Sequence, residues 1–113
     1  MVPRKRFLFV FGYETPSERE YNMKFGSDLE SSEIVFIEAE DAERALEWGK
    51  CIAEKFLCAL YGSPGVSWRK LGYASYIDQS DPPDFDPASI ASAPCVSVGE
   101  LPDIANLVKG AHR

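Results

Sequence analysis

The sequence predicts an α+β fold: a single small mixed β-sheet of about four strands, with one long helix packed on one face. Residues 7–11 and 34–37 are short, continuous apolar runs, the pattern of strands that are covered on both faces. Residues 41–61 instead repeat apolar side chains at steps of three and four, which indicates an amphipathic helix. A chain of 113 residues has the length of one domain, so residues 1–113 are predicted to share one core.

The first two strands are expected at residues 4–14 and 32–40. Successive side chains of a strand point to opposite faces, so one face of the first strand is rich in phenylalanine and the other is aliphatic. The facing sets are Phe7, Phe9 and Phe11 on one side and Leu8 and Val10 on the other. Both strands therefore need neighbours above and below, which favours central positions in the sheet.

A short helix is expected between these strands, at residues 16–24. Ser17 is followed three residues later by Glu20, the spacing of a capping box, and Pro16 directly precedes Ser17. Gly26 is expected to end this helix.

The long helix is expected from Asp41, a suitable N-cap, to Gly62, a suitable terminator. Its small residues Ala45, Gly49 and Ala53 would let the helix approach the sheet closely. The same three residues also fit a helix–helix contact, and the sequence leaves that alternative open.

The last third of the chain is predicted to hold two strands and a short helix. The third strand is expected at residues 67–78 with a bulge at Gly72, and the fourth at residues 95–98. A final helix is expected from Pro102. The second strand, the long helix and the third strand would form a right-handed parallel βαβ unit, and a ferredoxin-like arrangement is the nearest common fold.

Charge and cysteine content exclude several classes of function. The formal net charge is -6, and between Leu71 and Val108 the chain has six acidic residues and no base, so no nucleic-acid partner is expected. No stretch is long and apolar enough to suggest a membrane span. The three cysteines have no CxxC spacing and are interpreted as reduced, mostly buried thiols of a cytoplasmic protein.

No motif predicts a metal, a cofactor or a catalytic residue. The aspartates between residues 78 and 86 do not fit the calcium-loop pattern in any register, because proline, phenylalanine and alanine occupy ligand positions. The only histidine, His112, is the penultimate residue, which argues against nucleophilic catalysis. An alternative function remains open: a small enzyme or ligand-binding protein. Its carboxylate/tyrosine pocket would lie between sheet and helix or at a dimer interface, built from Glu14 or Glu38 with Tyr73 or Tyr76.

The leading hypothesis concerns residues 78–94, which are acidic and proline-rich. They are expected to form an irregular loop that is either a stiff connector or part of an acidic pole that binds a basic protein surface. The pole and its apolar contacts would consist of Asp78, Asp81, Asp84, Phe85, Asp86, Glu100, Asp103 and Trp48. Small size, acidity and the lack of catalytic residues are similar to those of many small bacterial inhibitor and immunity proteins. This resemblance of type implies a non-catalytic interaction module.

Association is also expected from packing. The strands are apolar on both faces, yet only one long helix is available to cover them. Short helices near residues 17–24 and 102–109 would have to cover the second face, or a homodimer partner or another protein would do so.

Overall fold

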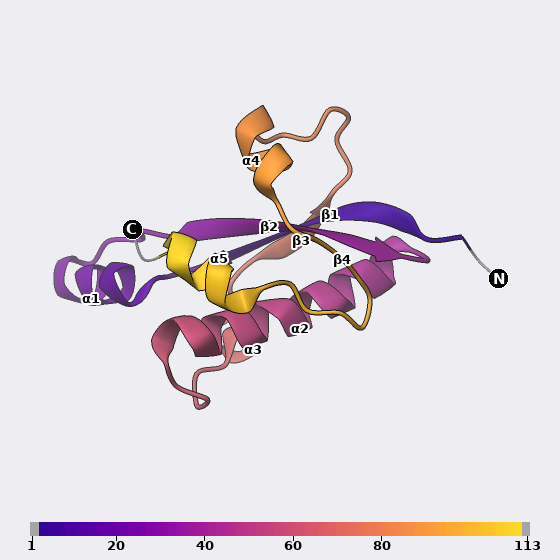
Figure 1. Cartoon of the computed structure of the whole chain (residues 1–113). Helices are drawn as coiled ribbons and strands as arrows, with labels where there is room; N and C mark the ends of the chain where they lie inside the picture. Colours follow the sequence, from indigo (N-terminus) through magenta and orange to yellow (C-terminus); the bar gives the residue numbers. More distant parts are fainter. Residues whose placement is uncertain (1–2, 112–113) are drawn as a thin grey trace.

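The computed structural model describes residues 3–111 and forms one mixed sheet with helices on both sides (Figure 1). Its elements, in chain order, are β1 (Lys5–Tyr13), α1 (Pro16–Phe25), β2 (Ser31–Ala39), α2 (Ala42–Tyr61), α3 (Trp68–Leu71), β3 (Ser75–Asp78), α4 (Pro87–Ser92), β4 (Cys95–Ser97) and α5 (Ile104–Ala111). The strand order across the sheet is β3-β1-β2-β4. The predicted α+β class and the central positions of the first two strands are confirmed.

The pairing of the strands differs from the predicted parallel βαβ unit. β3 pairs with β1, not with β2, and the pair is antiparallel. The only parallel pair among the described residues joins β2 to β4. A helix separates every two consecutive strands, whereas a ferredoxin-like chain runs βαββαβ, so the order of elements also differs from that fold.

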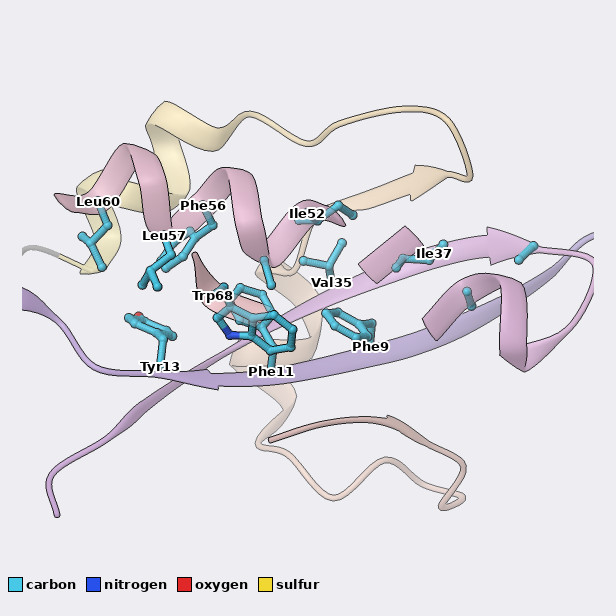
Figure 2. Close-up of a cluster of buried hydrophobic side chains, with 13 residues drawn as sticks. Phe9, Phe11, Tyr13, Val35, Ile37, Ile52, Phe56, Leu57, Leu60 and Trp68 are labelled. Carbon is cyan, nitrogen blue, oxygen red and sulfur yellow. The ribbon is translucent and has the colours of Figure 1, made fainter. Parts of the chain in front are cut away.

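The main core lies between the sheet and α2 (Figure 2). Phe11 and Tyr13 of β1 contact Phe56 of α2, and the rings of Phe11 and Phe56 meet edge to face at 5.4 Å between centroids. Gly49 allows this approach, because a Cβ atom there would overlap the ring of Phe9. The small-residue track therefore faces the sheet, as the first of the two alternatives predicted.

Both ends of α2 follow the sequence signals. The side chain of Asp41 accepts a hydrogen bond from the backbone N–H of Arg44 at 2.8 Å, which caps the N-terminus. Gly62 ends the helix with a φ of 65°, a left-handed conformation that glycine adopts without strain.

The second face of the sheet is covered by the proline-rich segment 79–94. Leu8, Val10 and Ile34 are buried there. The partly buried side chains packed against them are Phe36, Phe85, Ile90 and Ala93. Figure 1 shows α4 and its loop alone above the sheet, with α2, α3 and α5 below it.

Two expectations about this face are therefore wrong. The helices expected to cover it lie elsewhere, because α1 extends past the end of the sheet and α5 packs against α2 on the first face (Figure 1). The prolines also do not exclude regular structure. Asp86 caps α4 and Pro87 occupies its first turn, where proline has no N–H bond to lose.

The third strand is shorter than predicted, because residues 67–72 form a helical turn. The Ser67 hydroxyl accepts from the N–H of Lys70, and Glu54 of α2 accepts from the N–H of Arg69 at 2.8 Å. Gly72 ends the turn with a φ of 75° instead of forming a bulge. Trp68 is thereby buried in the main core, where its indole N–H donates to the backbone oxygen of Gly12 at 2.8 Å.

The capping box of α1 lies two residues earlier than predicted. The Thr15 hydroxyl accepts from the N–H of Glu18, and the Glu18 carboxylate accepts from the N–H of Thr15 at 2.8 Å. Ser17 and Glu20 take no part in this box. Gly26 ends the helix as expected, and no residue of α1 is buried.

Candidate functional site

The residues of the expected acidic pole lie on opposite sides of the sheet. Asp78 ends β3, and Asp81, Asp84 and Asp86 follow it in the segment 79–94 that crosses the second face. Glu100 and Asp103 instead precede α5, which lies with α2 on the first face (Figure 1). The structure therefore brings the first four together and separates them from the other two.

Two of these aspartates shape the loop that holds them. Asp78 accepts hydrogen bonds from Ser80 and from the N–H of Asp84, and these bonds hold the pKa of the Asp78 carboxyl below its usual value. Asp86 accepts from the backbone N–H of Ser89 at 2.7 Å, which lowers its pKa in the same way. Asp81 and Asp84 are exposed. The lowered pKa values keep the Asp78 and Asp86 carboxylates negatively charged at neutral pH.

Trp48 contacts its own chain. It is half-buried at the side of α2, and its indole N–H donates to the backbone oxygen of Glu100 at 2.7 Å. The Glu100 carboxylate accepts from the N–H of Ser97, and Asp103 accepts from the N–H of Asn106 at the start of α5. These three expected contact residues thus hold the connection between β4 and α5 against α2.

The cysteines are free thiols, but they are less buried than expected. Cys51 and Cys58 are half-buried on α2, and Cys95 is exposed on β4. Cys95 is exposed because β4 is an edge strand.

The first half of β2 has an open edge. Its neighbour β4 is three residues long and pairs only with Phe36, Ile37 and Glu38. The N–H of Phe36 donates to the oxygen of Pro94 at 2.8 Å, so the even-numbered residues of β2 direct their backbone groups away from β1. Ser32 and Ile34 continue that series, and no strand of the described chain pairs with them on this side.

This open edge lies in a hollow of about 360 Å³ between α4 and α5, hereafter the edge groove. One wall comes from the segment with α4, the floor from β2 and the other wall from α5. The lining residues are Ser32, Glu33, Ile34, Phe85, Ser89, Ser92, Ala93, Pro94, Asn106, Leu107 and Gly110. Phe85 is the one member of the expected acidic pole that lines it.

A second hollow of about 320 Å³ adjoins the edge groove on the second face of the sheet. It shares Ser32 and Phe85 with the groove. Gly12 and Ala74 form part of its floor, so the sheet surface there has little side-chain volume. The aromatic ring of Tyr76 stands at its side and is 51% exposed.

Glu33 is the only charged residue in the described part of the chain that lines the edge groove. Its carboxylate accepts a hydrogen bond from the hydroxyl of Tyr13 at 3.1 Å. Burial raises the pKa of Glu33 above its usual value, although the Tyr13 bond partly opposes this effect. Burial, together with the Glu33 charge, also raises the pKa of Tyr13, so its hydroxyl keeps its proton and donates.

The expected carboxylate/tyrosine pair forms at the end of β1. Tyr73 donates to Glu14 at 2.5 Å and Asn22 of α1 donates to its other oxygen at 2.5 Å. The Tyr73 bond lowers the pKa of Glu14, and burial with the Glu14 bond raises that of Tyr73. Neither group is therefore tuned for proton transfer near neutral pH. The pair instead attaches α1 to the body of the protein.

The other two residues of that hypothesis lie apart from the pair. Glu38 is beside Cys95 and Tyr76 is on β3, so neither contributes to the hollow next to Glu14. That hollow lies beside α1, and the space between the sheet and α2 is filled by core side chains.

Among residues 3–111, no group of three or more histidine, cysteine, aspartate or glutamate side chains is placed to hold a metal ion. No helix in this range is both long and apolar enough to cross a membrane. His112 lies outside the described residues. No family model, curated protein or solved structure significantly matches the chain.

Sequence reasoning found Phe85 but missed the rest of the edge groove. The available signal was the composition of β2, which begins with three polar residues, Ser31, Ser32 and Glu33, before its apolar run. A polar start indicates that the faces of the strand are less covered there, but it does not reveal a missing neighbouring strand. The walls could not be found this way, because α4 and α5 are far from β2 in sequence.

Proposed function

We propose that this protein is a non-catalytic interaction module that binds an extended segment of a partner protein along the open edge of β2. The single observation that carries the proposal is the unpaired backbone of Ser32 and Ile34 at the floor of the edge groove. Each residue offers one N–H and one C=O group toward the groove, in line with the β2–β4 ladder. An extended segment would add as a short fifth strand and satisfy these groups.

The walls of the groove favour a single segment over a second sheet. α4 flanks the edge on one side and α5 flanks it on the other. A groove with a helix on each side suits one inserted strand rather than the broad edge of a second sheet. The open stretch covers residues 31–35, or about 16 Å of extended chain, so a segment of about five residues fits it.

Charge favours a basic segment. Within residues 3–111 no lysine or arginine lines the groove, whereas Glu33 does. The exposed Asp84 and Asp86 flank Phe85 at the groove wall. Exposed charges of this kind accelerate the approach of a basic partner more than they tighten the final complex. Binding is therefore expected to weaken as salt rises.

The proposal is tested by selecting binders from a library of random peptides, about ten residues long, on the purified protein. A selected peptide is then titrated into the wild type and into the variant Ser32→Pro. Proline removes the N–H that faces the groove but no hydrogen bond to β1, so the sheet should remain intact. We expect Ser32→Pro to weaken binding at least about tenfold, because the lost hydrogen bond and the proline ring both oppose strand addition.

The matched control is Ser32→Ala, which changes the side chain and keeps the N–H. It should bind the peptide like the wild type. Hydrogen exchange supplies a second readout: the amides of Ser32 and Ile34 should exchange faster than those of Glu33 and Val35 in the free protein, and slow on binding. If no peptide is selected, or if Ser32→Pro binds as well as Ser32→Ala, the proposed function is wrong.

A further inference from the structure

The partner segment can be described further through Glu33, an inference that rests on the proposed function. Glu33 lies between Ser32 and Ile34, so its side chain points to the opposite face of the sheet from theirs. That face carries α2 and α5, and Asn106 and Leu107 of α5 line the groove there. The Glu33 carboxylate is thus on the α5 side of the open edge.

The Glu33 carboxylate is partly buried and has one hydrogen-bond partner among the described residues. One oxygen accepts from Tyr13, and no donor in the described part of the chain bonds to the other. The ion pairs within residues 3–111 involve only Arg44 and Lys50 of α2, so no cation of this range pairs with Glu33. Burial without a counter-charge disfavours the ionised form, in agreement with its raised pKa.

An added strand would place a side chain next to this carboxylate. Residues directly opposite on neighbouring strands point to the same face, with their Cβ atoms about 5 Å apart. The segment residue opposite Glu33 would therefore point to the α5 side. Its two neighbours would point to the α4 side, toward Phe85 and Ala93.

We propose that the partner segment carries a basic residue opposite Glu33, with an apolar residue on each side of it. The basic residue supplies the missing counter-charge and donates to the free carboxylate oxygen. Arginine suits the position better than lysine, because a guanidinium is more weakly hydrated and donates through two N–H groups at once. The apolar neighbours pack on Phe85 and Ala93, where the groove offers no charge.

The test uses the peptides selected from the random library and has two parts. In the first, the selected sequences are aligned, and an apolar–basic–apolar triplet is expected among them. In the second, one selected peptide and its arginine-to-glutamine form are titrated against wild type and Glu33→Gln. Glutamine keeps an oxygen that accepts from Tyr13, so the variant removes the charge and leaves the strand in place.

Each single change is expected to weaken binding about tenfold, and the two together no more than either alone, because both remove the same ion pair. The matched control is Glu38→Gln, which removes a charge from the paired half of the same strand and should bind like the wild type. Additive losses, or equal binding by Glu33→Gln and wild type, would overturn this inference.

These outcomes are distinct from a failure of the proposed function. Peptides that lose affinity for Ser32→Pro but lack a basic residue and ignore Glu33→Gln would support edge binding and refute the charge pair. If peptides are insensitive to Ser32→Pro, or if none is selected, both the proposed function and this inference fail.

Discussion

At the scale of single residues, Glu33 is an ionisable side chain that is partly buried. Tyr13 of β1 donates to it, and beyond Tyr13 lies Glu18 of α1, whose charge also acts on the Tyr13 hydroxyl. Because burial raises the folded pKa of Glu33, the protonated carboxyl is favoured in the folded state. The stability that Glu33 contributes is therefore present at acid pH and lost as pH rises through its folded pKa.

Glu33→Gln is accordingly expected to stabilise the free protein at neutral pH, by up to about 1 kcal/mol. The gain should vanish below the ordinary glutamate pKa of about 4.3, where the wild-type carboxyl is also neutral. Thermal unfolding of the wild type and of Glu33→Gln at several pH values measures this gain in stability. Tyr13→Phe removes a hydrogen bond that favours the ionised form of Glu33. The stability of the Tyr13→Phe protein should therefore fall more steeply with rising pH than that of the wild type. A gain of equal size at acid and neutral pH would contradict this account.

At the scale of elements, the sequence predicted those whose signals are local and repeated. α2 has its apolar stripe, its Asp41 cap and its Gly62 terminus, and all three were readable in advance. The third strand is shorter than predicted because residues 67–78 fit a strand alternation, while Ser67 and Gly72 also carry the cap and terminator of a helical turn, which is the structure that forms. Asp86 and Pro87 carry the start signal of α4, but they lie within a proline-rich segment whose composition predicts an irregular loop.

The candidate site was less predictable than the elements. The edge groove depends on β4 being short and on which strand β4 joins, and neither property has a local signal. Phe85 was identified as an apolar contact, but its packing beside Leu8, Val10 and Ile34 follows only from the strand order. Ser32 and Glu33 are unremarkable strand residues until their open edge is known.

Gly49 provides the element-scale prediction. Alanine favours helices over glycine by about 1 kcal/mol, but a Cβ atom at Gly49 would overlap the buried ring of Phe9. Gly49→Ala is therefore expected to lower the free energy of unfolding by about 1–3 kcal/mol, as overpacked cores do. The matched control is Gly110→Ala in α5, where a Cβ atom would meet open space. Denaturant unfolding should show a lower free energy of unfolding for Gly49→Ala and an unchanged one for Gly110→Ala. A Gly49→Ala protein that is more stable than the wild type would contradict the close packing of α2 on the sheet.

At the scale of the whole molecule, the acidic segment 79–94 has two roles that act together. It covers one face of the sheet through Phe85, Ile90 and Ala93, and it forms one wall of the edge groove. This cover meets the packing need that had suggested a homodimer through the sheet. It leaves the aspartates at the surface, where they remain available to a basic partner.

Substitutions at Asp86 separate these two roles. Asp86→Ala removes the cap of α4 and should lower the unfolding temperature by about 4 °C. The loosened cover should also expose Leu8, Val10 and Ile34 to a hydrophobic dye before the sheet unfolds. Asp86→Asn keeps a capping side chain and removes the charge, so it should retain the stability of the wild type.

Asp84→Ala is the matched control, because it removes a neighbouring charge whose carboxylate accepts no hydrogen bond within the described residues. It should change neither the unfolding temperature nor the dye signal. If Asp86→Ala and Asp84→Ala have the same unfolding temperature and the same dye signal, the cap of α4 does not hold the cover in place. If Asp86→Asn is as stable as the wild type but binds selected basic peptides more slowly at low salt, the charge of this segment acts in association and its cap acts in folding.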